Sequence, residues 1–248
     1  MASLRSNRFV LGLVLAIAVV VAAVVVLLVA GSDDDETTAT EPSTTTTTEG
    51  STTTPSTARP SVSDAEAATI VWPDPEGELT YDDSIAVVRD FAVELIGFED
   101  PLYGAFQQGD DRSGEVEVRA LQDGPATTVL VRQMSDDHWY VIAAVSSELE
   151  LDTPTPGSAI DHPLQVAGRA RAFEGQVRVA VYERGSTAPL GEGFVTASGT
   201  EELGPFAGDV SWANPGGGWG SVVLTTASAE DGSVWTAMAI PVGFIGGD

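Results

Sequence analysis

The stretch QVRVAVYE, residues 176–183, alternates apolar and polar side chains and sets the fold class of the C-terminal segment. Its valines at positions 177, 179 and 181 fall on one face of an extended strand, and the polar residues between them fall on the other. Similar short runs recur before and after it, separated by glycine, proline or Asp-Gly, at residues 149–151, 164–170, 192–197, 207–212, 220–226 and 234–242. About seven strands in roughly 100 residues predict a two-sheet β-sandwich over residues 148–248.

The preceding segment, residues 68–147, has a different pattern. Between Tyr81 and Phe98, apolar residues recur at helical spacing; Asp82 or Asp83 can cap the start of a helix and Gly97 can end it. Three strand-like runs follow at 114–121, 127–134 and 138–145, with turns at 123–125 and 135–137. We therefore expect a small α+β domain in which one helix packs across a three-stranded antiparallel sheet.

Residues 32–67 contain the low-complexity stretch SDDDETTATEPSTTTTTEGSTTTPSTARPSVS, composed almost entirely of Thr, Ser, Pro, Gly and acidic residues. Such a segment buries too little apolar surface to offset the entropy of ordering, so we expect a disordered linker. Thr/Ser-Pro tracts of this kind can carry O-linked sugar, and an unmodified spacer is the alternative.

Residues 9–31 read FVLGLVLAIAVVVAAVVVLLVAG, with Arg5 and Arg8 before them and an acidic run after them. A helix of this length spans about 33 Å, enough to cross a hydrocarbon core of about 30 Å. The flanking arginines predict that residues 1–8 lie in the cytoplasm and that the rest of the chain lies outside. A cleaved secretory signal is the alternative, but its apolar region usually runs only about 7–15 residues.

The composition agrees with an exterior location. All 37 acidic residues and nine of the 11 arginines follow the apolar segment, which leaves that part with a net charge of −28, and the chain contains no lysine. Such a surface repels nucleic acid and anionic lipid, so we expect no nucleic-acid partner. The absence of cysteine excludes disulfides, thiolate zinc sites and cysteine nucleophiles.

The C-terminal segment also carries motifs of a known family. The stretch PTPGSAIDHPLQVAGRARAFEGQVRVAVYE, with Pro156-Gly157, Gly168 and Phe173-Glu174-Gly175, resembles the immunoglobulin-like domain of bacterial spore germination proteins. Later motifs continue the resemblance, at 193–194, 204–206, 231–232 and 240–242. The resemblance covers roughly the last 100 residues and implies a non-catalytic immunoglobulin-like β-sandwich at the cell envelope. The order of anchor, linker, α+β segment and sandwich resembles membrane-anchored envelope proteins of actinobacteria.

Two positions are candidates for partner binding. In Phe173-Glu174-Gly175 we expect Phe173 to plug the end of the sandwich, Gly175 to form a tight turn, and Glu174 to accept backbone hydrogen bonds or else contact a partner. Trp219 lies between glycines at a strand entry, where an exposed ring can stack on a sugar or an apolar side chain; alternatively it caps the sandwich edge. The remaining tryptophans of these strands, Trp139, Trp212 and Trp235, are expected in the core or as half-buried cover.

Catalytic and metal-binding patterns are sparse. The two histidines, His138 and His162, fall in different segments, and adjacent residues such as Asp136-Asp137-His138 in a turn point in different directions. The pairs Asp82-Asp83 and Asp110-Asp111 begin no calcium-binding loop, and the chain has neither a Gly-x-Ser-x-Gly elbow nor a phosphate-binding loop. We therefore expect no catalytic residue, no metal and no cofactor.

These patterns predict a membrane-anchored, extracytoplasmic binding or structural module of the cell envelope that is not an enzyme. Its expected partners are the membrane, through a single-pass anchor, and cell-wall polymer or another envelope protein. The alternative is an exported hydrolase with a site between the two folded segments; 37 acidic residues place some carboxylate pairs near each other by chance, so such pairs say little about it.

Overall fold

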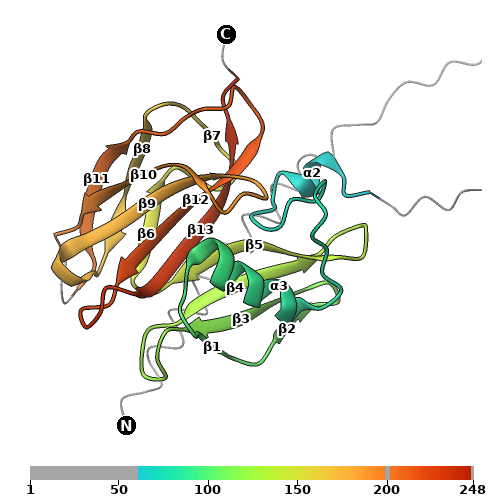
Figure 1. Cartoon of the computed structure of the whole chain (residues 1–248), viewed down its shortest axis with the longest axis horizontal. Helices are drawn as coiled ribbons and strands as arrows, with labels where there is room; N and C mark the ends of the chain where they lie inside the picture. The colour runs from blue at the N-terminus through green and yellow to red at the C-terminus, as the bar shows by residue number, and fades with distance from the viewer. Residues whose placement is uncertain (1–60, 199–201, 247–248) are drawn as a thin grey trace, which may run out of the picture. The chain divides into compact units, whose positions relative to one another are not determined.

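The computed structural model describes residues 61–198 and 202–246. The predicted transmembrane segment and the linker as far as residue 60 lie outside the described residues. Within the described ranges, no helix is both long and apolar enough to span a bilayer. The elements, labelled in Figure 1, are the helices α2 (Asp64–Ala67) and α3 (Ser84–Asp90), the π-helical turn η1 (Phe91–Ile96), the 3₁₀ turn η2 (Phe173–Gly175), and the strands β1 (Leu102–Tyr103), β2 (Gln107–Asp110), β3 (Ser113–Arg119), β4 (Thr127–Gln133), β5 (Trp139–Ser146), β6 (Leu149–Thr153), β7 (Ala159–Ile160), β8 (Leu164–Ala170), β9 (Gln176–Glu183), β10 (Pro189–Thr196), β11 (Gly204–Val210), β12 (Trp219–Ala227) and β13 (Val234–Phe244).

The predicted helix is present with its expected ends. Asp83 rather than Asp82 caps α3, because its Oδ1 accepts a hydrogen bond from the Ala86 N–H at 2.8 Å. The helix passes into η1 and ends at Gly97, which has a φ of 86° and so the left-handed conformation that glycine tolerates best. Strands β3, β4 and β5 form the expected antiparallel meander, and the short strands β1 and β2 both add to β3.

The C-terminal segment forms two antiparallel layers. One layer has the strand order β6, β8, β11, and the other has β13, β12, β9, β10. All seven predicted strands occur, and the short β7 adds parallel to the end of β13. Val177, Val179 and Val181 are buried, as their alternation predicts, and Val179 and Val181 lie opposite Leu224 and Val222 of β12. The described fold is mainly β and antiparallel, with few helices, as an immunoglobulin-like sandwich requires.

The two predicted domains share one sheet. Strand β5 pairs with β13 through Ala144 and Ala239 on one side and with β6 through Ser146 and Leu149 at its end. Residues 60–248 accordingly form one compact unit. The boundary that we predicted between residues 147 and 148 therefore separates two sequence segments but not two separate sheets.

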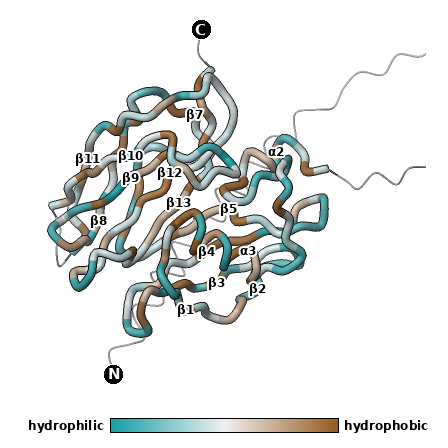
Figure 2. The backbone as a smooth tube through the Cα atoms, viewed as in Figure 1, coloured by the Kyte–Doolittle hydropathy of each residue, from teal (hydrophilic) through white to brown (hydrophobic). Residues whose placement is uncertain are grey.

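A single apolar core also joins the two segments. Figure 1 shows α3 lying across β3 and β4, and the buried cluster beneath it extends along β13, β12 and β9. From the sandwich this core includes Ala180, Tyr182, Val223, Ala237 and Ala239, and from the first segment it includes the apolar residues of α3, η1, β3, β4 and β5. The alternation predicted that the face of β9 opposite its valines points outward. Ala180 and Tyr182 are instead buried, because this face of the sandwich packs against the helical segment. Figure 2 shows the corresponding hydrophobic colour along the central strands.

Buried hydroxyl groups tie β4, β5 and β13 together where the segments meet. Thr236 Oγ1 lies 3.0 Å from Thr127 Oγ1 and donates to Ser146 Oγ at 2.7 Å. Thr127 Oγ1 also accepts the Ala237 N–H at 3.0 Å. Since these groups are buried, each hydrogen bond replaces one that water would make in the unfolded chain.

The N-terminal segment is held against the sheet by side-chain contacts. Ser63 and Glu66 form a capping box at α2, and the Glu66 carboxylate also accepts hydrogen bonds from Ser135 N at 3.0 Å and Ser135 Oγ at 2.7 Å. Burial raises the pKa of Glu66, but the hydrogen bonds from Ser135 and Ser63 outweigh it and hold this pKa below its ordinary value. Residues 61–67, which we assigned to the linker, thus belong to the folded unit.

A second set of contacts, farther along the same segment, also holds it against the sheet. Arg184 at the end of β9 donates to Ala67 O at 2.8 Å and to Asp74 Oδ1 at 3.2 Å, and its side chain is only 12% exposed. Trp72 forms an antiparallel bridge with Val141, and its indole N–H donates to Asp90 Oδ2 at 2.8 Å. These contacts connect the segment to β9, β5 and α3 respectively.

Candidate functional site

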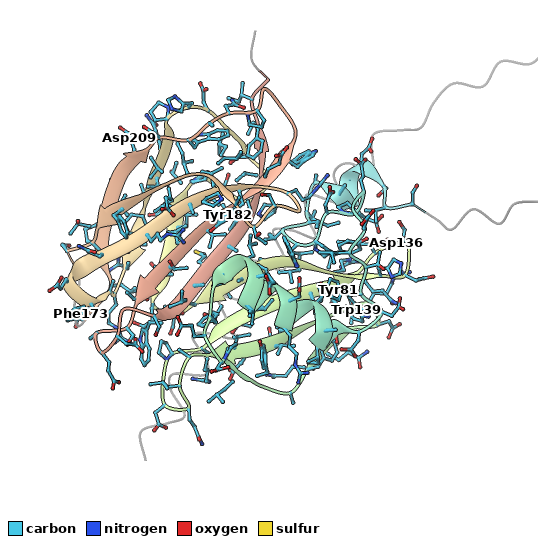
Figure 3. All side chains as sticks on the ribbon, in the orientation of Figure 1. Tyr81, Asp136, Trp139, Phe173, Tyr182 and Asp209 are labelled. Atoms are coloured by element: carbon cyan, nitrogen blue, oxygen red, sulfur yellow. The ribbon has the colours of Figure 1, made fainter. Side chains whose placement is uncertain are left out.

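The Phe173-Glu174-Gly175 turn lies at the end of the sandwich, between β8 and β9. Phe173 is 54% exposed and projects from the end of the sandwich (Figure 3), so the prediction that it plugs the core is wrong. Gly175 forms the expected turn at a φ of 71°, and a Cβ there would lie 2.2 Å from Ala197 O. Glu174 is exposed and has a positive φ of 53°. Across the η2 turn the Gly175 N–H donates to Ala172 O at 2.9 Å, and Ala172 is the buried apolar residue here.

Trp219 is half-buried at the start of β12. It lies opposite Gly243 of β13, and its ring covers that glycine, since a Cβ built on Gly243 would meet the ring at 3.4 Å. Gly216, Gly217 and Gly218 before it all have positive φ. This geometry matches the edge-capping alternative and leaves part of the ring open to solvent. Trp212 is buried against Phe244, while Trp139 and Trp235 are half-buried, as we predicted.

The polar residues around the Asp136 turn have structural contacts. Asp136 is buried and accepts a hydrogen bond from the Tyr140 hydroxyl at 2.7 Å, and Figure 3 shows it at the tip of the β4–β5 hairpin. His138 is also buried, with Nδ1 2.9 Å from Asp82 Oδ1, whereas His162 lies exposed in the loop before β8. No group of three or more His, Asp or Glu side chains within 61–198 and 202–246 is arranged to hold a metal ion.

Asp110 likewise supports a turn. Its carboxylate accepts the Arg112 N–H at 2.8 Å, and this backbone hydrogen bond is the main reason that the pKa of Asp110 lies below its ordinary value. Glu148 and Arg171 form an ion pair at the join between β6 and β8, which holds the pKa of Arg171 above its ordinary value. These carboxylates stabilise loops and strand ends.

An open groove follows the π-helical turn, and we define it by its lining residues. Val93, Phe98, Glu99, Asp100, Pro101 and Tyr103 line a volume of about 580 Å³. Of these, Phe98 is buried, Tyr103 is half-buried and Val93 is 45% exposed. Leu102, which is 47% exposed, lies next to it on β1. The 93–103 groove therefore combines apolar surface that faces solvent with two carboxylates.

Local backbone geometry explains why the groove forms. The η1 turn widens the helix, and π-helical turns occur frequently at functional sites. Gly97 then reverses the chain in the left-handed region, and Asp100 has a φ of 45°, an uncommon conformation for a residue other than glycine. The chain after it returns as β1, where Leu102 and Tyr103 lie opposite Arg119 and Val118 of β3.

The groove has an acidic rim and one neighbouring cation. Arg89 of α3 lies over the Tyr103 ring, with its guanidinium carbon 5.4 Å from the ring centroid. Burial raises the pKa of Tyr103, while the charge of Arg89 lowers it; burial dominates. Glu99 and Asp100 are both exposed, and no described arginine forms an ion pair with either. The groove lining therefore carries negative charge that no described ion pair compensates.

A second, smaller groove of about 250 Å³ lies between residues 73–79 and the β9–β10 turn. Its cation is Arg184, which already binds Asp74 and Ala67 O. Glu78 and the half-exposed Leu79 complete its wall. Since Arg184 holds the N-terminal segment in place, the polar groups of this groove serve mainly structural contacts.

The 93–103 groove was not predicted from the sequence. Val93 departs from the apolar face of the predicted helix, and FEDPLY at 98–103 combines aromatic, acidic and proline residues, which is the one signal that could have marked it. The structure brings neither Trp219 nor Glu174 to this groove: Trp219 lies at the β12–β13 end of the sandwich and Glu174 in the turn between β8 and β9.

The comparisons with known proteins agree with the sandwich. Residues 148–233 match the family described as the immunoglobulin-like domain of bacterial spore germination, which confirms the resemblance seen in the sequence. No curated protein and no solved structure matches the chain. The matched range begins at the junction of β5 and β6 and ends in the turn before β13.

Proposed function

We propose that this protein is a membrane-anchored, extracytoplasmic binding module of the cell envelope and not an enzyme. The observation that carries the proposal is the 93–103 groove, where apolar side chains face solvent beside unpaired carboxylates. Protein interfaces combine apolar side chains with a polar rim in this way. The groove lies on η1 and β1, and β1 pairs with β3 of the sheet that continues through β4 and β5 to β13 of the sandwich.

The packing between the two segments bears on the alternative function. An exported hydrolase with a site between them would need a cavity with polar side chains there. Apolar residues of both segments pack into one core there. In the polar groove between residues 73–79 and the β9–β10 turn, Arg184 is already engaged by Asp74 and Ala67 O. No described observation favours the hydrolase, and its activity stays a prediction of the sequence alone.

The predicted location follows from residues 1–31 and is part of the proposal. Single cysteines can test it, because the chain has none of its own. Ser3→Cys and Ser51→Cys variants would be treated in intact cells with a membrane-impermeant maleimide. We expect labelling at position 51 only; labelling at position 3, or loss of residues 1–31 from the mature chain, would contradict a single-pass anchor with a cytoplasmic N-terminus.

Partner binding is tested by measuring how much of the protein is retained on candidate partner material. Purified full-length protein in detergent would be incubated with isolated cell wall and, separately, with a membrane-protein extract of the source organism. Saturable retention on wall polymer or on one protein would support a binding module and would identify the partner. Absence of saturable retention on both materials would contradict it.

Two variants then separate the candidate contacts. Trp219→Ala removes the half-buried ring at the sandwich end, and Glu174→Gln removes the charge in the turn before β9. A loss of retention in either would assign partner contact to that residue. Unchanged retention of both variants would leave the 93–103 groove as the candidate contact surface.

A further inference from the structure

We infer that the 93–103 groove binds a segment of a partner protein in which a lysine or arginine lies beside apolar residues. The inference rests on the proposed function and specifies the partner chemistry of one site. Its structural basis is the juxtaposition of the apolar side chains of Val93, Pro101 and Tyr103 with the carboxylates of Glu99 and Asp100, all of which line the groove.

The apolar part of the groove fits the stem of a long cationic side chain. Lysine and arginine bury their methylene groups along apolar surface while the charged head remains in polar surroundings. Val93 and Leu102 extend the apolar surface at the rim, and both are about half exposed. A neighbouring apolar side chain of the partner can cover them.

The acidic end fits the charged head. Glu99 and Asp100 have no ion-pair partner within the described chain, so a cation of the partner meets charges that are not already compensated. Arg89 contributes positive charge over the Tyr103 ring. The positive head of an incoming side chain is therefore attracted to residues 99–100 and repelled by Arg89.

Other occupants fit less well. A sugar ring needs an open aromatic face, but Arg89 covers the face of Tyr103 and Phe98 is only 3% exposed. A second copy of this chain carries a net charge of −26 and no lysine, so acidic surface would meet acidic surface. Nucleic acid and anionic lipid are repelled for the same reason.

The experiment measures binding of dye-labelled synthetic peptides to the full-length protein in detergent by fluorescence polarisation. The probe peptide is Gly-Leu-Lys-Leu-Lys-Gly, and the comparison peptides replace both lysines by glutamine or both leucines by serine. We expect saturable binding of the probe, about tenfold weaker binding of each comparison peptide, and weakening as sodium chloride rises from 50 to 500 mM, because salt screens exposed charge.

Matched variants distinguish the groove from diffuse attraction to an acidic protein. Glu99→Gln with Asp100→Asn removes the groove charges, and asparagine tolerates the left-handed conformation of residue 100. Glu202→Gln with Glu230→Gln removes the same charge from exposed positions elsewhere. We expect the first pair to weaken probe binding about tenfold and the second to leave it unchanged.

A parallel pair tests the apolar contribution. Val93→Ser with Leu102→Ser removes the exposed rim, whereas Leu121→Ser changes a leucine that is 55% exposed outside the groove. The inference is overturned if the probe does not saturate, if the charge control weakens binding as much as the groove variant, or if the glutamine peptide binds as tightly as the probe. Retention of the groove variants on envelope fractions would then show whether a binding module remains with its site elsewhere.

Discussion

Val223 provides a direct test of the shared core. On β12, Val222 faces the interior of the sandwich and Val223 faces the core beneath α3, and both are buried. If residues 148–248 formed a separate sandwich, Val223 would lie on its outer face and tolerate replacement. In the structure, Val223→Ala should be as destabilising as Val222→Ala.

The size of the effect follows from burial. Removing two methylene equivalents costs about 1.6 kcal/mol in transfer free energy, and the cavity that remains brings the total to about 2–3 kcal/mol. For a unit of this size, a loss of 1 kcal/mol lowers Tm by about 2–4 °C, so each variant should melt roughly 5–10 °C below the parent. Val93→Ala, at a position 45% exposed, is the matched control and should stay within about 0.5 kcal/mol.

The assay is thermal and urea unfolding of the full-length protein in detergent, followed by circular dichroism and tryptophan fluorescence. We expect one transition that both probes report at the same midpoint, because residues 60–248 form one compact unit. A Val223→Ala midpoint equal to that of the parent, with Val222→Ala still destabilised, would refute the shared core. Two separate transitions would refute it as well.

Three further predictions concern the junction, the sandwich and the N-terminal clamp. Thr127→Val leaves the buried Ala237 N–H without its acceptor and should cost about 1–3 kcal/mol in urea unfolding, while Thr127→Ser, which keeps the hydroxyl, should cost clearly less; equal costs would contradict the hydroxyl network. Gly168→Ala would place a Cβ 2.1 Å from Glu150 O and should strongly lower Tm, whereas Gly193→Ala has its nearest contact at 3.4 Å and should be mild; the reverse order would contradict the strand packing. The folded-state pKa of Glu66 is lowered, so its charge stabilises the fold above its ordinary pKa of 4.5 and this contribution is lost as the pH falls through the folded pKa. The Tm difference between parent and Glu66→Gln should therefore shrink from pH 6 to pH 3, and a difference independent of pH would argue against the carboxylate clamp.

Strand positions could be predicted from the sequence because alternation reports one-sided burial directly. Even so, β12 reads SVVLTT and β13 reads TAMAIPV, and such near-continuous apolar runs indicate strands buried on both faces. Such runs indicate that another part of the chain covers the outer face of β12 and β13. Which segment covers it depends on the long-range pairing of Ala144 with Ala239. A single-residue register match of this kind leaves no pattern in the sequence.

The candidate site was harder to predict than the fold. The position of Phe173 depends on the η2 turn, which turns its side chain outwards even though its residue type favours burial. The 93–103 groove depends on a π-helical turn and on the positive φ of Asp100, and neither has a strong signature in residue type. Trp219 was expected at the strand entry, and only the structure shows that Gly243 opposite leaves room for its ring.

The clamps on residues 63–74 determine how the folded unit responds to mechanical load. Tension carried along the chain from residue 61 reaches the Glu66 contacts with Ser135 first and then the Arg184 contact with Ala67 O. The bridge between Trp72 and Val141 follows, and then the contact of Arg184 with Asp74. These contacts are few and lie in series, so they should rupture one after another at low force. Strand β13, hydrogen-bonded along most of its length to β12 and also joined to β5, lies beyond them and would be spared. The N-terminal segment would thus detach and lengthen under tension before the sandwich unfolds.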